Sequence, residues 1–217
     1  MAMVGVTPET AVNAITGIKN AYSELINVLT TSVETNYVGK IAEAWGSPAA
    51  VKIMGAFKSD LDSQIRGITT TFGSIVSTMN AAAKALLEQQ QYTGWVDIRF
   101  SPNERANVNV SSVQESLGGS IEADHSLVET ANATLTGTIT QEVNTALSHA
   151  KSAVSNSGFI GGGMQESLVS SLSSIQSSIN NAFSKVAGEI SKTSATSTSN
   201  LEEGATTIAS DNFTVSE

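Results

Sequence analysis

The chain has 217 residues, of which 40% are hydrophobic, 5% are aromatic and 14% are charged, and its formal net charge is −9. The apolar fraction is large enough for a buried core, whereas the scarcity of aromatic side chains favours long, thin helical packing. The negative charge argues against nucleic acid or an anionic membrane surface as a partner, the absence of cysteine excludes disulfide and thiolate chemistry, and no apolar run approaches the ~18 residues of a transmembrane helix.

A first long helix is predicted to begin at Thr7-Pro8-Glu9. The Thr7 hydroxyl suits an N-cap, Pro8 fits the first helical position, and Glu9 suits the positive end of the helix dipole. Apolar residues then recur in steps of three and four, at Val12, Ile15, Ile18, Tyr22, Leu25, Leu29 and Val33. Such steps are typical of a heptad-like stripe. The pattern weakens over 37–39, so we expect a local irregularity before Ile41, Ala44 and Trp45 continue it.

The segment 42–50 separates this helix from a second one. It holds Trp45 and Gly46, and then Ser47-Pro48, which repeats the cap-then-proline start of a helix. The second stripe has steps of three and four throughout: Met54, Phe57, Leu61, Ile65, Ile68, Phe72, Ile75, Met79, Ala82 and Leu86. We interpret the stripe as core packing, and the two helices with their turn as a helical hairpin.

Residues 92–110 break this rhythm. Apolar side chains alternate at Val96, Ile98 and Phe100 and again at Val108 and Val110, around a turn sequence at 101–104. Alternation of this kind predicts a short β-hairpin. The alternative is that Ser101, Pro102 and Glu104 form a capping box that starts the third helix early.

Ser111 or Ser112 is expected to cap a third helix, which ends at 155–158, with a weak point at Gly118-Gly119. Its looser stripe comprises Val113, Leu117, Ile121, Val128, Leu135, Ile139, Val143, Leu147 and Val154. After Phe159-Ile160-Gly161 a fourth stripe follows: Met164, Leu168, Leu172, Ile175, Ile179, Ala182, Val186 and Ile190. From Thr193 the chain is rich in serine and threonine, which predicts a fraying helix end and a mobile acidic tail.

The predicted fold class is therefore all-α, with two long antiparallel helical hairpins forming an elongated four-helix bundle and a short β-hairpin at the connector. The predicted divisions are hairpin one over 1–95 with its turn near 45–48, the connector over 96–110, hairpin two over 111–193 with its turn near 155–163, and the tail over 194–217. The halves differ in charge: residues 1–110 carry 9 acids and 8 bases, whereas residues 111–217 carry 11 acids and 3 bases.

The length of each half, the paired heptad-like helices and the aromatic-plus-glycine turn resemble the Trp-x-Gly superfamily of helical-hairpin proteins exported by type VII secretion. The first turn, Trp45-Gly46-Ser47, departs from Trp-x-Gly because the glycine directly follows the tryptophan. Phe159-Ile160-Gly161 fits aromatic-x-Gly. Members of the family commonly pair two hairpins as a dimer, so the resemblance implies a fused pseudo-dimer here.

The family's export signal is an aromatic residue, three further residues and an acid, placed just beyond the helices. Phe213 followed by Glu217 fits this form, with phenylalanine in place of tyrosine. A first-half candidate at Tyr92 fails, because Val96 stands four residues on and Asp97 lies one position late.

The remaining candidate residues favour structural roles. Trp45 is interpreted as a core residue that closes a hairpin, with a surface that docks on a partner as the alternative. Gly46 and Gly161 are expected to supply backbone freedom. His125 and His149 lie 24 residues apart on one predicted helix, too far apart to share a metal. No metal-ligand motif is present, and no serine has a base and an orienting acid at a recognised spacing.

These observations predict a non-enzymatic exported helical-bundle protein, a type VII secretion substrate or secretion partner that acts by protein–protein binding without a cofactor. A secretion ATPase or a cognate helical-hairpin protein is the expected partner, and a homodimer is an open alternative. The expected location is secreted without an N-terminal signal peptide, with cytoplasmic as the alternative. The alternative function is a self-assembling or scaffold subunit, phage- or flagellin-like, without a role in secretion.

Overall fold

The computed structural model describes residues 6–115 and 123–210, and this part of the chain is mostly helical. It contains no β-strand, so the all-α prediction is confirmed. The elements in chain order are α1 Pro8–Asn27, η1 Val28–Ser32, η2 Glu34–Val38, α2 Gly39–Ala44, α3 Pro48–Gln89, α4 Ser111–Glu115, α5 His125–Thr134, η4 Leu135–Ile139, α6 Thr140–Ser155 and α7 Gly162–Ser210, where η denotes a π-helix.

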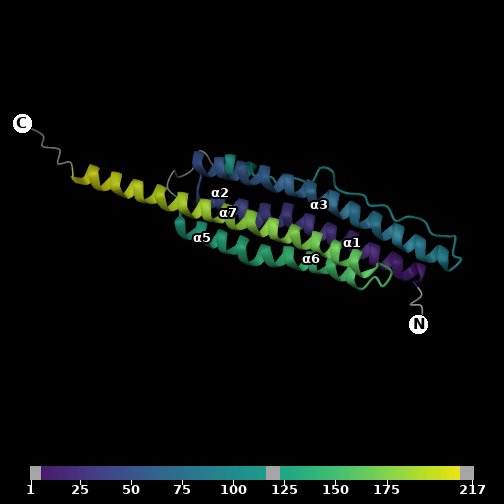
Figure 1. The fold of residues 1–217 in the computed structure, drawn as a ribbon. Coiled ribbons are helices and arrows are strands. Elements are labelled where there is room, and N and C mark those ends of the chain that lie inside the picture. Colours follow the sequence, from purple (N-terminus) through teal and green to yellow (C-terminus); the bar gives the residue numbers. More distant parts are fainter. Residues whose placement is uncertain (1–5, 116–122, 211–217) are drawn as a thin grey trace, which may run out of the picture.

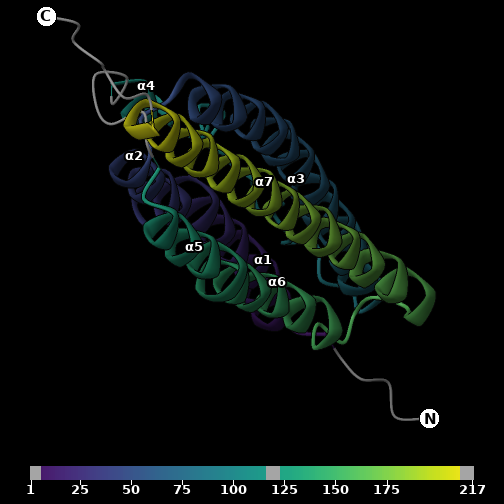
Figure 2. The same cartoon turned by 90° about the vertical axis from the view of Figure 1, so that its left-hand side faces the viewer.

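Long helical segments lie side by side along the molecule (Figure 1). The run α1–η1–η2–α2 packs on α3 and on the run α5–η4–α6, and α7 packs on α3 and on α5–η4–α6. Figure 2 shows α7 between α3 on one side and α5–α6 on the other. The first segment and α3 run antiparallel: Tyr22 contacts Thr69, whereas Tyr37, farther along the first segment, contacts Phe57, which lies earlier on α3.

Helix α3 is favoured both by the capping residues at its start and by the apolar stripe that it buries in the core. The Ser47 hydroxyl accepts a hydrogen bond from the Ala50 N–H at 3.2 Å, and Pro48 occupies the first helical position. Its buried residues recur in steps of three and four, so one continuous stripe faces the core. Helix α1 begins in the same manner, with a capping box between Thr7 and Thr10.

The π-helical stretches occur where the core spacing is strictly four. Rotation in an α-helix is about 100° per residue, so a step of four overshoots a full turn by about 40°. Several such steps in a row rotate the apolar stripe gradually around the helix and away from the core. A π turn has more residues per turn, so it offsets this rotation. The buried series on the two runs are Leu25, Leu29, Val33, Tyr37 and Ile41, and Ala131, Leu135, Ile139, Val143 and Leu147. The irregularity expected over 37–39 is therefore real, and it begins earlier, at Val28.

The predicted β-hairpin at the connector does not form. Residues 92–110 contain no strand, and they run as an irregular segment along α3 (Figure 1). Side chains of α3 bind its backbone in place of a partner strand. The Asn80 amide makes two hydrogen bonds of 2.9 Å to the backbone of Ile98, and the Asp62 carboxylate accepts one of 2.8 Å from the Val108 N–H.

The third and fourth helices also differ from their predicted bounds. The third is divided: α4 covers Ser111–Glu115, and α5 starts again at His125 with the Asp124 carboxylate as its N-cap, at 3.1 Å from the Leu127 N–H. The predicted weak point at Gly118-Gly119 lies outside the described residues. Helix α7 continues to Ser210, beyond the predicted boundary at 193, and its last part projects past the other helices (Figure 1).

No helix in the described part of the chain is both long enough and apolar enough to span a bilayer.

Candidate functional site

The turn at Trp45 joins three helix ends. α2 ends at Ala44, and α3 begins at Pro48. The Ala44 carbonyl accepts a hydrogen bond of 2.9 Å from the Asp124 N–H, which brings the start of α5 to the same end of the molecule. Trp45 is extended (φ −157°, ψ 107°), and its N–H donates to the Ile41 carbonyl at 2.8 Å. The break between α2 and α3 therefore consists of Trp45, Gly46 and Ser47.

The Trp45 side chain is 1% exposed and belongs to the core. Its indole Nε1 is buried and makes no hydrogen bond within the described part of the chain. A buried indole fills the space where the helices converge, which favours the interpretation of Trp45 as a core residue that closes the hairpin. A partner could contact this side chain only if the turn opened.

The second turn lies between Ser155 and Gly162, within the predicted range. Phe159 is buried, and the hydroxyl of Ser157 donates to the Val154 carbonyl at 2.8 Å. Gly158 has a φ of +70° and is the described glycine in the left-handed region. Gly46 and Gly161 are not among the described glycines with a positive φ, so that their role is to supply backbone freedom stays a prediction. The Gly161 carbonyl accepts a hydrogen bond from Gln165 in the first turn of α7.

Replacing Gly158 with alanine is expected to lower the free energy of unfolding by about 1 kcal/mol, because a side chain disfavours a positive φ. Space is not the obstacle, since no heavy atom of another part of the chain lies within 4 Å of the added Cβ. Gly163→Ala is the control: it lies in the first turn of α7 with equally open surroundings, and no loss is expected. Urea denaturation of both variants measures the difference, and equal stability of the two would contradict the assignment.

A buried polar connection crosses the core near the π-helical stretches. The Tyr37 hydroxyl donates to Asn132 Oδ1 at 3.2 Å, and Asn132 Nδ2 donates to the Ala187 carbonyl at 3.0 Å. Burial raises the pKa of Tyr37 well above its usual value, so the phenol stays protonated and donates. The ring of Tyr37 packs edge-on against Phe57, and Phe57 packs against Phe183.

This connection was not predicted from the sequence. Its hydrogen bonds join η2, α5 and α7, and the ring contacts of Tyr37, Phe57 and Phe183 add α3 at the same level. A signal was present: Asn132 follows Val128 by four residues and precedes Leu135 by three, which places an amide on the apolar face. Buried polar groups of this kind specify register, because a slip would leave them unpaired.

The two histidines have separate structural partners. His125 Nδ1 lies 3.0 Å from the Ser194 hydroxyl, and His149 Nδ1 lies 2.9 Å from the carboxylate of Glu24. Within residues 6–115 and 123–210, no three histidine or acidic side chains gather where they could hold a metal ion.

Shallow grooves follow two of the helix–helix seams. One, of about 380 Å³, lies between α3 and α7 and is lined by Gln64, Gly67, Ile68, Thr71, Ser171, Ser174, Ile175 and Ser178. Two more, of about 420 and 280 Å³, lie between the first segment and the run α5–η4–α6 and share Thr138. The lining combines hydroxyl and amide side chains with apolar ones such as Ile68, Ile175 and Leu127, and the second and third grooves also carry the charged residues Glu24, Glu142, Lys40 and Glu43.

Phe213 and Glu217, the residues of the predicted export signal, lie outside the described residues. The structure places the end of α7 at Ser210, three positions before Phe213 in the chain. Comparisons with protein-family models, with curated proteins and with solved structures find no match for this chain.

Proposed function

We propose that this protein is a non-enzymatic substrate or partner of a type VII secretion system, built as two helical hairpins fused in one chain and acting by protein–protein binding. The hairpins would be α1–α2 with α3, and α5–α6 with α7, in an elongated four-helix bundle. The resemblance to the Trp-x-Gly superfamily carries the assignment to this export route.

The observation that supports the proposal most is the Trp45 turn. A tryptophan followed by glycine and a capped helix start stands between long antiparallel helices, and the tryptophan closes their shared core. The second turn, with buried Phe159, repeats the aromatic at the opposite end of the run α5–η4–α6. A chain with only 14% charged residues fits a protein that acts by contact, because charged side chains are depleted at the centres of protein–protein interfaces.

The placement of α7 supports a role for the segment that follows it. Because the last part of α7 projects past the other helices (Figure 1), the residues after Ser210 follow a helix end that no other described helix covers. A signal has to be accessible to the machinery that reads it, and export signals in this family lie just beyond the helices. Phe213 and Glu217 are the residues proposed to be recognised.

Deleting residues 211–217 is expected to abolish export in cells that carry the cognate type VII machinery, while leaving helix content and melting temperature unchanged. Culture-medium and cell fractions measure export, and circular dichroism measures folding. Phe213→Ala and Glu217→Ala should each reduce export, whereas Val215→Ala, between them, should not. Normal export of the folded truncated protein would refute this signal.

A further inference from the structure

The connector holds one short stretch of backbone against α3 through a single side chain. The Ile98 N–H donates to Asn80 Oδ1, and Asn80 Nδ2 donates to the Ile98 carbonyl, both at 2.9 Å. The amide of Asn80 thus pairs with both backbone groups of Ile98, as a neighbouring strand would. These two groups point to the same side, which is the arrangement of an extended strand.

In an extended strand the backbone groups of successive residues point to opposite sides. Because those of Ile98 point to α3, those of Asp97 and Arg99 point away from it. Both residues are exposed, and no hydrogen bond joins their backbone groups to any described part of the chain. Val96, beside them, is 80% exposed, the highest value among the exposed large apolar side chains. The connector therefore presents an open strand edge.

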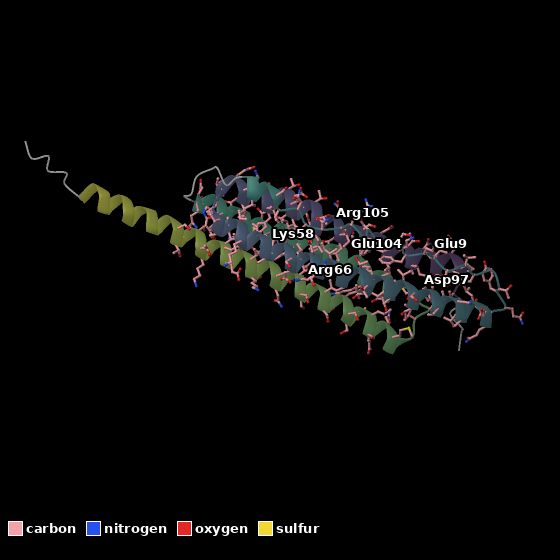
Figure 3. All side chains as sticks on the ribbon, turned by 90° about the horizontal axis from the view of Figure 1, so that it is seen from above. Glu9, Lys58, Arg66, Asp97, Glu104 and Arg105 are labelled. Atoms are coloured by element: carbon pink, nitrogen blue, oxygen red, sulfur yellow. The ribbon has the colours of Figure 1, made fainter. Side chains whose placement is uncertain are left out.

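Side-chain contacts hold this stretch in place at both of its ends. Trp95 Nε1 donates to the Asp97 carboxylate at 3.1 Å, and the Phe100 ring packs edge-on against Tyr22 with centroids 4.8 Å apart. Figure 3 shows Asp97 on the surface, with Glu104 and Arg105 farther along the same connector. An ordered, unpaired edge is a ready template for another strand, and little ordering entropy is lost when one pairs with it.

The stretch is also complementary to itself. If two copies pair antiparallel about Ile98, Asp97 of each copy stands opposite Arg99 of the other, and Val96 stands opposite Phe100. The outward backbone groups of Asp97 and Arg99 are then the ones that exchange hydrogen bonds. A two-fold interface has to match itself in this manner, and opposite charges directly across a strand pair stabilise it.

We propose that the outer edge of residues 96–100 is a self-association site, through which a second copy of this chain adds its own connector as an antiparallel strand. The two Asp97–Arg99 pairs let copies that each carry a net charge of −9 meet at a locally neutral surface. The pairing also covers Val96. The proposal does not depend on the export function, because it concerns a different surface and a different partner.

Sedimentation equilibrium of the full-length chain over a range of concentrations is expected to show a monomer–dimer equilibrium. Asp97→Arg or Arg99→Asp alone places like charges opposite each other at two positions, and should raise the dissociation constant by about tenfold or more. Combining the two substitutions restores opposite charges and should restore most of the dimer. Glu104→Arg and Arg105→Asp are matched controls, with the same charge changes on exposed residues of the same connector.

Amide hydrogen exchange supplies an independent measurement. The Asp97 and Arg99 amides should exchange more slowly as the protein concentration rises, whereas the Ile98 amide should be protected at every concentration because it is bound to Asn80. A monomer at all concentrations would overturn the proposal. So would a dimer whose stability changes equally in the control variants, or one that the double exchange of charges fails to restore.

Discussion

Replacing Trp45 with alanine is expected to lower the free energy of unfolding by about 3–5 kcal/mol, the usual cost of removing a large, fully buried aromatic side chain. The side chain is 1% exposed and lies where the ends of α2, α3 and α5 meet. The surrounding helix ends are tied to one another by backbone hydrogen bonds and caps, so they cannot collapse freely into the cavity. Denaturant unfolding measures the loss.

Tyr92→Ala is the matched control, because this aromatic side chain is 41% exposed on the connector. Its removal should change stability by no more than about 0.5 kcal/mol. The pair also separates a structural role for Trp45 from a docking role. If Trp45→Ala lost export or partner binding while keeping its stability within about 1 kcal/mol of the parent, the side chain would be a recognition residue, and the interpretation as a core residue would be wrong.

The second large effect is expected at Asn132. Asn132→Leu keeps the volume but leaves the buried Tyr37 hydroxyl without its acceptor and the Ala187 carbonyl without one donor. An unsatisfied buried hydroxyl costs about 1–3 kcal/mol, so a loss of about 2–3 kcal/mol is expected in total. Tyr37→Phe alone should cost about 1–2 kcal/mol, because it leaves the Asn132 oxygen unpaired.

A double-mutant cycle makes this prediction specific. The variant with both Tyr37→Phe and Asn132→Leu should be more stable than the sum of the single losses by about 1–2 kcal/mol, since no polar group of that pair remains to be left unpaired. Tyr22→Phe is a useful comparison. Its hydroxyl bonds to Thr69 at 2.9 Å, and Thr69 keeps its own hydrogen bond to Ile65, so the loss should be smaller. Strict additivity of the cycle would contradict a direct bond between Tyr37 and Asn132.

The spacing of the core residues predicts part of the local helix geometry. The steps of three and four on α3 predicted a regular helix, and it is regular. Steps of four from Leu25 to Ile41 and from Ala131 to Leu147 accompany the π turns, whereas the shorter run Ile75, Met79, Ala83 and Leu87 lies in regular α-helix. Apolar periodicity alone predicted only the weakening near Tyr37, because a stripe of steps of three and four does not distinguish two steps that differ by about 100° of rotation.

The connector shows the opposite case. Alternation at 96–100 and 108–110 predicted a β-hairpin, but it could not indicate that the backbone would bind side chains of α3 in place of a second strand. Asn80 and Asp62 belong to α3, eighteen and forty-six residues away in the chain from their partners, and they supply the hydrogen bonds that a second strand would have made. A local pattern carries no information on such distant side chains.

The sequence by itself determined the all-α class and the helix starts at Thr7-Pro8 and Ser47-Pro48, because caps, prolines and apolar periodicity act within a few residues. Only the tertiary structure decided that Trp45 is buried, that Gly158 and not Gly161 needs a positive φ, that Asp124 starts α5, and that Asn132 links three helical segments. Those outcomes depend on which surfaces meet when the helices pack, and the free energy of that packing comes from contacts between residues far apart in the chain.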